Sequence, residues 1–207
     1  MLALTGCCFW AAAAPLLLFG AHAFPIGDSS GEEEFGEDPS SRAAGRVQPN
    51  AWTELALWLQ GTAARWNREL CKEQNACKGT MEIMVQNNLN LPKIIKEDGC
   101  YQPGFQKETC LRRLSGGLYA FQTFLEYIEE TTQRHVSVSS GAQHLADTLK
   151  SMMNNPETVS MPSPDTQKTL SAKLREQRGW NMIVVKHFIL QDFTLFMETT
   201  SRVIRFL

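Results

Sequence analysis

Four segments of the chain carry apolar residues at the three- and four-residue spacing of an amphipathic helix. The pattern is most regular over residues 106–131, where large apolar side chains recur at intervals of 3, 4, 3, 4 and 3 residues. The predicted helices span residues 51–70, 106–131, 137–153 and 166–206. The sequence shows no comparable strand-like alternation, so we expect an all-α fold with one shared core.

The lengths of the predicted connections indicate the topology. The helices 106–131 and 137–153 are separated by a few residues, which makes them antiparallel neighbours. The first connection has about 35 residues, and the Pro-rich third one, residues 154–165, has about 12. Since ~12 extended residues reach ~40 Å, about the length of a 25-residue helix, either could run along the whole bundle. We therefore expect a four-helix bundle with up-up-down-down topology and two long crossover loops.

The N-terminal residues differ in composition from the rest. Residues 1–23 contain no Asp, Glu, Lys or Arg and end in Ala21-His22-Ala23, which is typical of a secretory signal peptide; a membrane anchor is the alternative. Residues 24–49 are acidic and then Gly/Ser-rich, which indicates a disordered leader or else an acidic binding tail. We expect residues 50–207 to form the folded domain of a secreted, extracellular protein.

Export would leave four cysteines in the mature chain, Cys71, Cys77, Cys100 and Cys110. Four cysteines allow three pairings, and pairing of sequence neighbours, Cys71 with Cys77 and Cys100 with Cys110, is the simplest. A zinc site is the alternative, but the spacings are wider than those of common zinc motifs, and exported thiols oxidise.

Little in the sequence indicates catalysis. It has no phosphate-binding glycine loop, no GxSxG and no HExxH, so we expect neither an enzyme nor a cofactor. The neighbours His144 and Asp147 could form a general base and its orienting carboxylate, although a surface hydrogen bond is the simpler interpretation. His187 falls on the inner side of its helix and is expected to be a satisfied interior histidine. A net charge of −2 does not favour nucleic-acid binding.

Two segments and the cysteine spacing carry a resemblance to a known family. The segment "NNLNLPKIIKEDGCYQPGFQKETCLRRLSGGLYAFQTFLEYIEE" and the tail "KHFILQDFTLFMETTSRVIRFL" resemble the interleukin-6 family of long-chain helical cytokines. Granulocyte colony-stimulating factor shares the cysteine layout, but "NNLNLPK" and "EDGC" favour the interleukin-6 side of the family. The resemblance covers residues 71–207 well and residues 24–65 poorly.

The resemblance implies three binding surfaces. One would bind an interleukin-6 receptor alpha subunit, and two would bind copies of glycoprotein 130, the signal-transducing beta subunit, so that receptor-associated kinases trigger STAT signalling in immune and acute-phase responses. The implied alpha-receptor residues are Tyr101, Phe105, Glu198, Arg202 and Arg205. The implied signal-transducing-receptor residues are Trp58, Thr62, His144 and Asp147 on one face, and Met84, Asn87, Leu89 and Trp180 on another.

Alternatives remain at several of these positions. Arg202 and Arg205 lie three residues apart and could instead complement the dipole at a helix C-terminus. Trp58 falls outside the apolar stripe, so it is either part of a second core row or an exposed anchor. For the whole chain, another long-chain helical cytokine with granulocyte colony-stimulating factor-like activity, or a secreted helical carrier of a lipid or small ligand, are the competing functions.

Overall fold

The structure confirms the all-α prediction, and three of the four predicted helices end within a few residues of their expected bounds. The computed structural model describes residues 49–86 and 89–207, and this part of the chain contains no strand. The three helices are α1 (Pro49–Gln74), α3 (Lys107–Thr132) and α4 (Val138–Ser151). The predicted signal peptide, and the predicted leader up to residue 48, lie outside the described residues.

The prediction of one long helix over residues 166–206 was wrong. The chain forms two helices there, α5 (Pro164–Glu176) and α6 (Gly179–Ile204). Gln177 and Arg178 are extended, and Gly179 has a φ of +54°, a conformation that glycine adopts without a Cβ penalty. The glycine, and the absence of an apolar stripe before residue 183, were the signals for this break. The second crossover is therefore longer than predicted and contains a helix of its own.

Local capping explains where the helices begin and end. Ser137 and Ser163 accept hydrogen bonds from the backbone N–H groups three residues on, which starts α4 and α5. Asn75 and Gln133 adopt the left-handed conformation that ends α1 and α3. The remaining short elements all lie in the two crossovers: η1 (Ala76–Lys78), α2 (Glu82–Gln86), η2 (Lys96–Asp98) and η3 (Pro156–Thr158).

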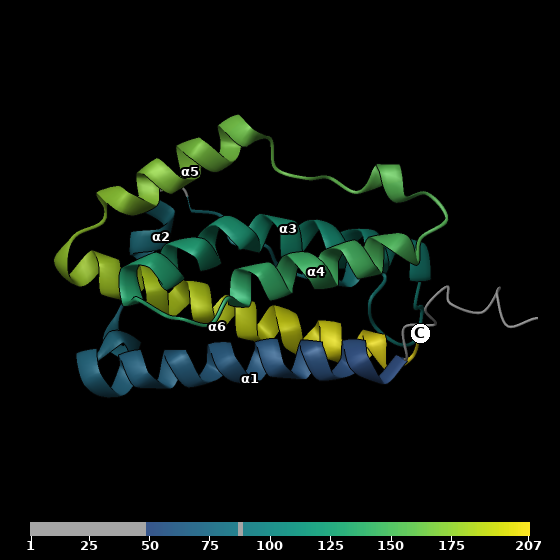
Figure 1. Ribbon diagram of the computed structural model, residues 1–207, viewed down its shortest axis with the longest axis horizontal. Coiled ribbons are helices and arrows are strands. Elements are labelled where there is room, and N and C mark those ends of the chain that lie inside the picture. Colours follow the sequence, from purple (N-terminus) through teal and green to yellow (C-terminus); the bar gives the residue numbers. More distant parts are fainter. Residues whose placement is uncertain (1–48, 87–88) are drawn as a thin grey trace, which may run out of the picture. The chain divides into compact units, whose positions relative to one another are not determined.

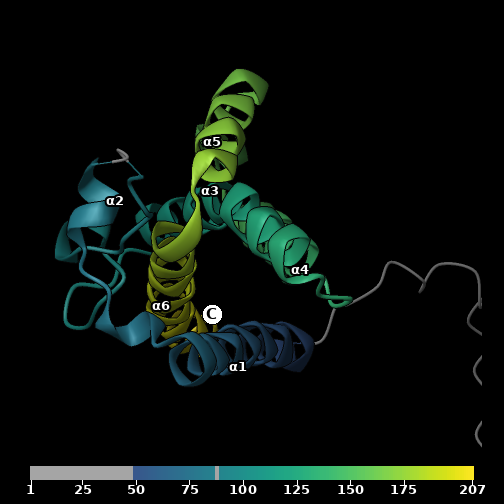
Figure 2. The same ribbon diagram turned by 90° about the vertical axis from the view of Figure 1, so that its left-hand side faces the viewer.

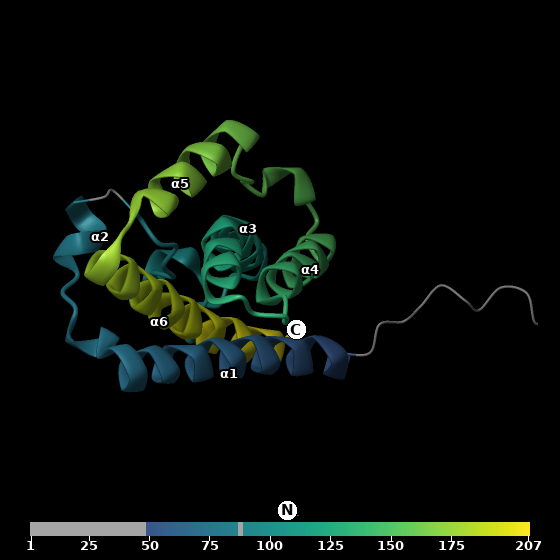
Figure 3. The same ribbon diagram turned by 60° about the vertical axis from the view of Figure 1, so that its left-hand side comes forward.

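The four long helices form the predicted up-up-down-down arrangement. α1 and α3 run in one direction, and α4 and α6 run in the other (Figure 1). α1 packs mainly on α6 and α3 mainly on α4, while α5 lies across α3 (Figures 2 and 3). Within the described residues, none of the helices is both long enough and apolar enough to cross a membrane.

The predicted stripes form the core. Every stripe residue of α3 is at most 1% exposed: Leu111, Leu114, Leu118, Phe121, Leu125 and Ile128. At the centre, the ring of Phe121 lies edge-on to Phe193 at 5.1 Å and to Phe196 at 5.3 Å, which joins α3 to α6. Aromatic pairs in this geometry add about 0.5–1.5 kcal/mol each beyond the area they bury.

A glycine on α3 makes this aromatic contact possible. A Cβ built on Gly117 would lie 2.4 Å from Cζ of Phe196, closer than van der Waals contact allows. Because the Phe196 ring also packs on Phe121, it has little room to move aside. Gly117 therefore stays in a helix interior despite its poor helix propensity.

We predict opposite outcomes for two glycine-to-alanine substitutions. Gly61→Ala, in α1, meets no atom within 4 Å, so it should raise the free energy of unfolding by about 0.5–1 kcal/mol through helix propensity. Gly117→Ala should lower it by about 1–3 kcal/mol through overpacking. Urea denaturation of the two variants and the parent measures both changes. A stabilised Gly117→Ala variant would contradict the packing described here.

Candidate functional site

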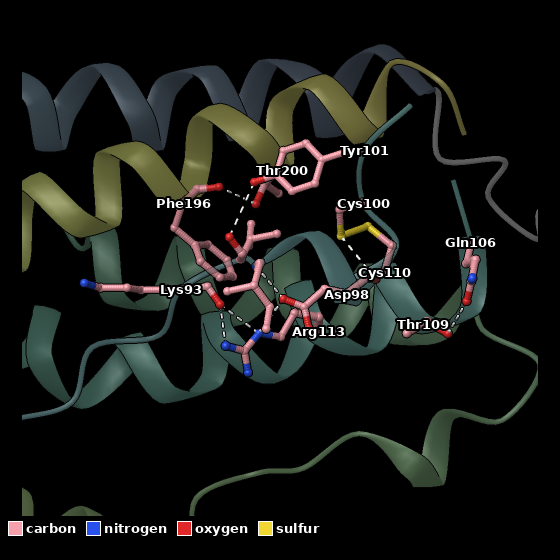
Figure 4. The surroundings of a disulfide bond; sticks show 12 residues. Lys93, Asp98, Cys100, Tyr101, Gln106, Thr109, Cys110, Arg113, Phe196 and Thr200 are labelled. Atoms are coloured by element: carbon pink, nitrogen blue, oxygen red, sulfur yellow. Dashed lines mark hydrogen bonds and ion pairs between the residues drawn. A yellow bond between two sulfur atoms is a disulfide. The ribbon is translucent and has the colours of Figure 1, made fainter. Parts of the chain in front are cut away.

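The end of the first crossover is fastened to α3 by one arginine. The Arg113 guanidinium donates a hydrogen bond to the Lys93 carbonyl oxygen at 2.9 Å and lies 3.3 Å from the Asp98 carboxylate (Figure 4). The same carboxylate accepts a hydrogen bond from the backbone N–H of Ile95 at 2.7 Å. One side chain on α3 thus holds two points of the crossover. Neither Arg113 nor Asp98 was predicted from the sequence, because nothing in the local pattern pairs residues this far apart.

A disulfide lies beside this arginine contact. Cys100 and Cys110 are bonded, which ties the crossover to the first turn of α3 (Figure 4). Gln106 also donates a backbone hydrogen bond to the Gly99 carbonyl oxygen at 2.8 Å. The second disulfide, Cys71–Cys77, joins the last turn of α1 to η1. Both predicted pairings are therefore confirmed.

The fastened crossover and α6 enclose a pocket of about 330 Å³. It is lined by Pro92, Lys93, Ile94 and Tyr101 from the crossover and by Asp192, Leu195, Phe196, Glu198 and Thr199 from α6. Lys93 lies 3.9 Å from Asp192 across the pocket. Burial raises the pKa of Asp192 above its usual value, and the nearby Lys93 ammonium offsets only part of this rise. The pocket brings together Tyr101 and Glu198, two residues that are almost 100 positions apart in the sequence and were assigned to the same surface.

The other residues assigned to that surface lie at the end of α6 and beside the disulfide. Glu198 and Arg202 form an ion pair one helical turn apart, and their side chains are 44% and 59% exposed. Arg205 is exposed directly after the helix, whereas Phe105 is half-buried and packs on the core. Phe206, which the sequence analysis missed, is 63% exposed. Because Phe206 falls beside the apolar stripe of its helix and not on it, its exposure could have been predicted from the sequence.

The predicted α1–α4 surface is only partly accessible. Trp58, on α1, is 44% exposed. The edge of its ring lies 3.4 Å from the position that a Cβ on Gly141 would occupy, so the ring extends from α1 towards α4. This answers the open question in favour of an exposed tryptophan. Thr62, however, is buried with the rest of its stripe, so its side chain is not open to direct receptor contact.

On the α4 side of this surface, His144 and Asp147 are both exposed. Asp147 accepts a hydrogen bond from the Tyr119 hydroxyl of α3. Burial, together with this carboxylate, raises the pKa of Tyr119 to about 12. The carboxylate thus serves the packing of α3 on α4, and the structure records no His144–Asp147 hydrogen bond in this part of the chain.

The third predicted surface needs a larger correction. Trp180 is 44% exposed in the first turn of α6, as a contact residue should be. Met84, in α2, and Leu89, which follows α2 and donates a backbone hydrogen bond to the Met84 carbonyl oxygen, are each 3% exposed, so their side chains are not open to direct receptor contact. Asn87 lies outside the described residues. The exposed apolar residues of this segment are Met81 and Val85, at 41% and 74%.

Comparisons with known proteins agree with this architecture. The family model of the Interleukin-6/G-CSF/MGF family matches residues 25–207. Interleukin-6 of Gallus gallus is 43% identical over 201 residues, which cover 93% of this chain and 81% of the relative. Interleukin-6 of Sus scrofa is 33% identical over 194 residues, which cover 92% of this chain and 91% of the relative.

The chain belongs to the interleukin-6 family. A chain in the crystal structure of a cytokine/receptor complex shares the fold, with a TM-score of 0.68 and 21% identity over 78% of this chain and 99% of that chain. Interleukin-6 proteins are cytokines, which act by binding and are not enzymes, so family membership confirms the prediction that this chain is not an enzyme.

The Tyr119–Asp147 contact predicts a pH dependence of stability. Because the pKa of Tyr119 is raised by folding, its stabilising contribution is complete below pH 10 and is lost as the pH rises towards about 12. Tyr119→Phe should lower the free energy of unfolding by about 1–2 kcal/mol at neutral pH. Urea denaturation of parent and variant across this pH range should show the difference shrinking above pH 10. A difference that stays constant with pH would contradict the assignment.

Proposed function

We propose that this protein is a secreted interleukin-6-type cytokine that binds an alpha receptor subunit and then bridges copies of glycoprotein 130. The observation that carries the proposal is the pocket between the first crossover and α6, which Tyr101 and Glu198 both line. Residues 1–23 would direct export, and residues 24–49 would form a leader preceding the bundle. Receptor-associated kinases would then phosphorylate one another and activate STAT signalling in immune and acute-phase responses.

The alpha-receptor surface we propose extends from this pocket to the end of α6. It consists of Tyr101, Phe105, Glu198, Arg202 and Arg205, with Phe206 added from the structure. Exposed arginine and aromatic side chains are the usual anchors of protein–protein contacts. The crossover half of the surface is already fastened by Arg113 and Cys100–Cys110, so little conformational entropy is lost when a partner binds.

The two signal-transducing contacts would use separate faces. One is the α1–α4 face with Trp58, His144 and Asp147. The other would combine Trp180 at the start of α6 with the exposed Met81 and Val85 of the crossover. Thr62, Met84 and Leu89 would support these faces from below. After the first receptor has bound, further contacts become effectively intramolecular, and avidity strengthens the assembly.

A carrier function fits the interior less well. The centre of the bundle is filled by Phe121, Phe193 and Phe196, of which the first two are 0% exposed. The pockets found in the described residues lie at the crossovers, against the outer sides of α3 and α6. A bound lipid of ordinary length would need the space that these rings occupy.

We predict that Arg202→Glu weakens binding of the purified mature protein to the alpha-receptor ectodomain at least about tenfold. The substitution removes an attractive contact and leaves two like charges one turn apart with Glu198. The helical circular dichroism spectrum should remain unchanged, because an exposed ion pair of this kind contributes only about 0–1 kcal/mol. Surface plasmon resonance measures the affinity.

Arg175→Glu is the matched control. Arg175 is also 59% exposed and pairs with Glu130 at 2.9 Å, but it lies on α5, outside the proposed surface. The Arg175→Glu variant should bind the alpha-receptor ectodomain with the same affinity as the parent protein. Trp180→Ala should also retain alpha-receptor binding. Equal losses in Arg202→Glu and Arg175→Glu, or a collapsed spectrum in Arg202→Glu, would sink the assignment of this surface.

A further inference from the structure

The two disulfides lie in different environments. Cys100 and Cys110 are 7% and 0% exposed, so an attacking thiol cannot reach either sulfur without opening of the crossover. Cys77 is exposed in η1, and its partner Cys71 is half-buried at the end of α1. Accessibility of a sulfur is a requirement for thiol–disulfide exchange. Only Cys71–Cys77 meets it among the two disulfides of the described residues.

A buried histidine lies directly behind the less exposed sulfur. Nδ1 of His187, on α6, is 3.7 Å from Sγ of Cys71 and 2.7 Å from Oδ1 of Asn67 on α1. A carbonyl oxygen can only accept, so with this amide orientation Nδ1 carries the ring proton. Burial also lowers the pKa of His187, which favours the neutral form of the ring. The Nδ1–H group is therefore placed to donate to Cys71 as well.

We propose that Cys71–Cys77 is a thiol–disulfide exchange site for a dithiol reductant, in which His187 is the positioning residue that stabilises the Cys71 thiolate. The arrangement assigns different roles to the two sulfurs. Sγ of Cys77 is the point of attack because Cys77 is the exposed residue of the pair, and Sγ of Cys71 is the leaving group because it faces the Nδ1–H donor. A leaving thiol whose anion is stabilised departs faster. This inference is independent of the receptor assignments.

The chemistry balances with the reductant as the only co-reactant. A thiolate of the dithiol attacks Sγ of Cys77, the Cys71–Cys77 bond breaks, and its electron pair leaves on Cys71 as a thiolate. The second thiol of the reductant then attacks the mixed disulfide, releases the Cys77 thiolate and forms the oxidised reductant. Two electrons pass to the cysteine pair, and the two thiolates take protons from the solution. The imidazole proton stays on the ring and contributes only its hydrogen bond.

Cleavage would release a short segment and leave the bundle in place. The disulfide closes a loop with a sequence separation of 6, so it contributes less to global stability than a long-range link would. It holds η1 against α6, where Ala76 is 0% exposed and a Cβ on Gly79 would lie 2.5 Å from Val184. We expect reduction to loosen the chain around residues 72–86, while the start of α3 stays fastened by Cys100–Cys110.

The test is graded reduction of the full mature chain with dithiothreitol in the presence of a metal chelator. Free thiols are trapped with iodoacetamide, and each cysteine is quantified by peptide mass spectrometry. Cys71 and Cys77 should be labelled together, at least about tenfold faster than Cys100 and Cys110. Amide hydrogen exchange should be faster in residues 72–86 of the partly reduced protein than in the oxidised protein, and it should be the same in α3 of both.

Substitutions at residue 187 separate the histidine's role from a general structural effect. His187→Leu should slow reduction of Cys71–Cys77 about threefold, since roughly one unit in the pKa of the leaving thiol changes the exchange rate by that factor. His187→Asn, whose amide N–H occupies the place of Nδ1, should restore the parent rate. Loss of packing alone would accelerate reduction, which is the opposite direction. His135→Leu, at an exposed histidine between α3 and α4, is the control and should have no effect.

Two results would overturn the proposal. One is labelling of Cys100 and Cys110 at the same rate as Cys71 and Cys77, or before them. The other is an unchanged or faster rate in a folded His187→Leu variant. If that variant does not fold, the Asn67→Ala variant tests the role of His187 instead. This substitution removes the competing acceptor Oδ1 of Asn67, so that the Nδ1–H group of His187 donates to Cys71 alone. Its rate should then exceed that of the parent, and an unchanged or slower rate would reject the role of His187.

Discussion

The parallel course of α1 and α3 is the constraint on which the rest of the structure depends. It obliges the chain to return along the bundle through the first crossover, residues 75–106, before α3 can begin. Some of its apolar side chains, among them Met84, Leu89 and Phe105, pack on the core. The segment is also held at discrete points: the disulfide at each end, the Arg113 contacts with Lys93 and Asp98, and the Lys93–Asp192 ion pair.

The same fastening points give the crossover its functional geometry. Arg113 and Cys100–Cys110 place Tyr101 beside α6, so two distant parts of the sequence share one pocket. A loose loop would have to be ordered by the partner, which would weaken binding. The two disulfides differ in this respect: the buried one shapes the pocket wall, and the exposed one controls η1 and the segment leading into α2. Stability of the bundle and presentation of the crossover are therefore largely separate.

The sequence predicted the parts of the fold that follow from helical periodicity. The stripes of α1, α3 and α4 are regular, so their buried faces and approximate bounds could be derived, and the connection lengths gave the topology. The break at Gly179 was missed because a polar α5 was read as a continuation of α6. Among the site residues, exposure of Trp58 and Trp180 was compatible with the predictions, but burial of Met84 and Leu89 depends on how α2 and the residues after it pack on the bundle, which no local pattern encodes. Arg113 was missed because its partners are set by tertiary structure.

The central claim is that the crossover and the end of α6 act as one binding surface. Hydrogen–deuterium exchange of the mature protein, measured with and without a saturating alpha-receptor ectodomain, tests it most directly. The account predicts joint protection of residues 93–105 and 195–207 in the complex, with α5 and the start of α6 unchanged. Protection of only one of these two segments, or protection confined to α5 or the α1–α4 face, would contradict it.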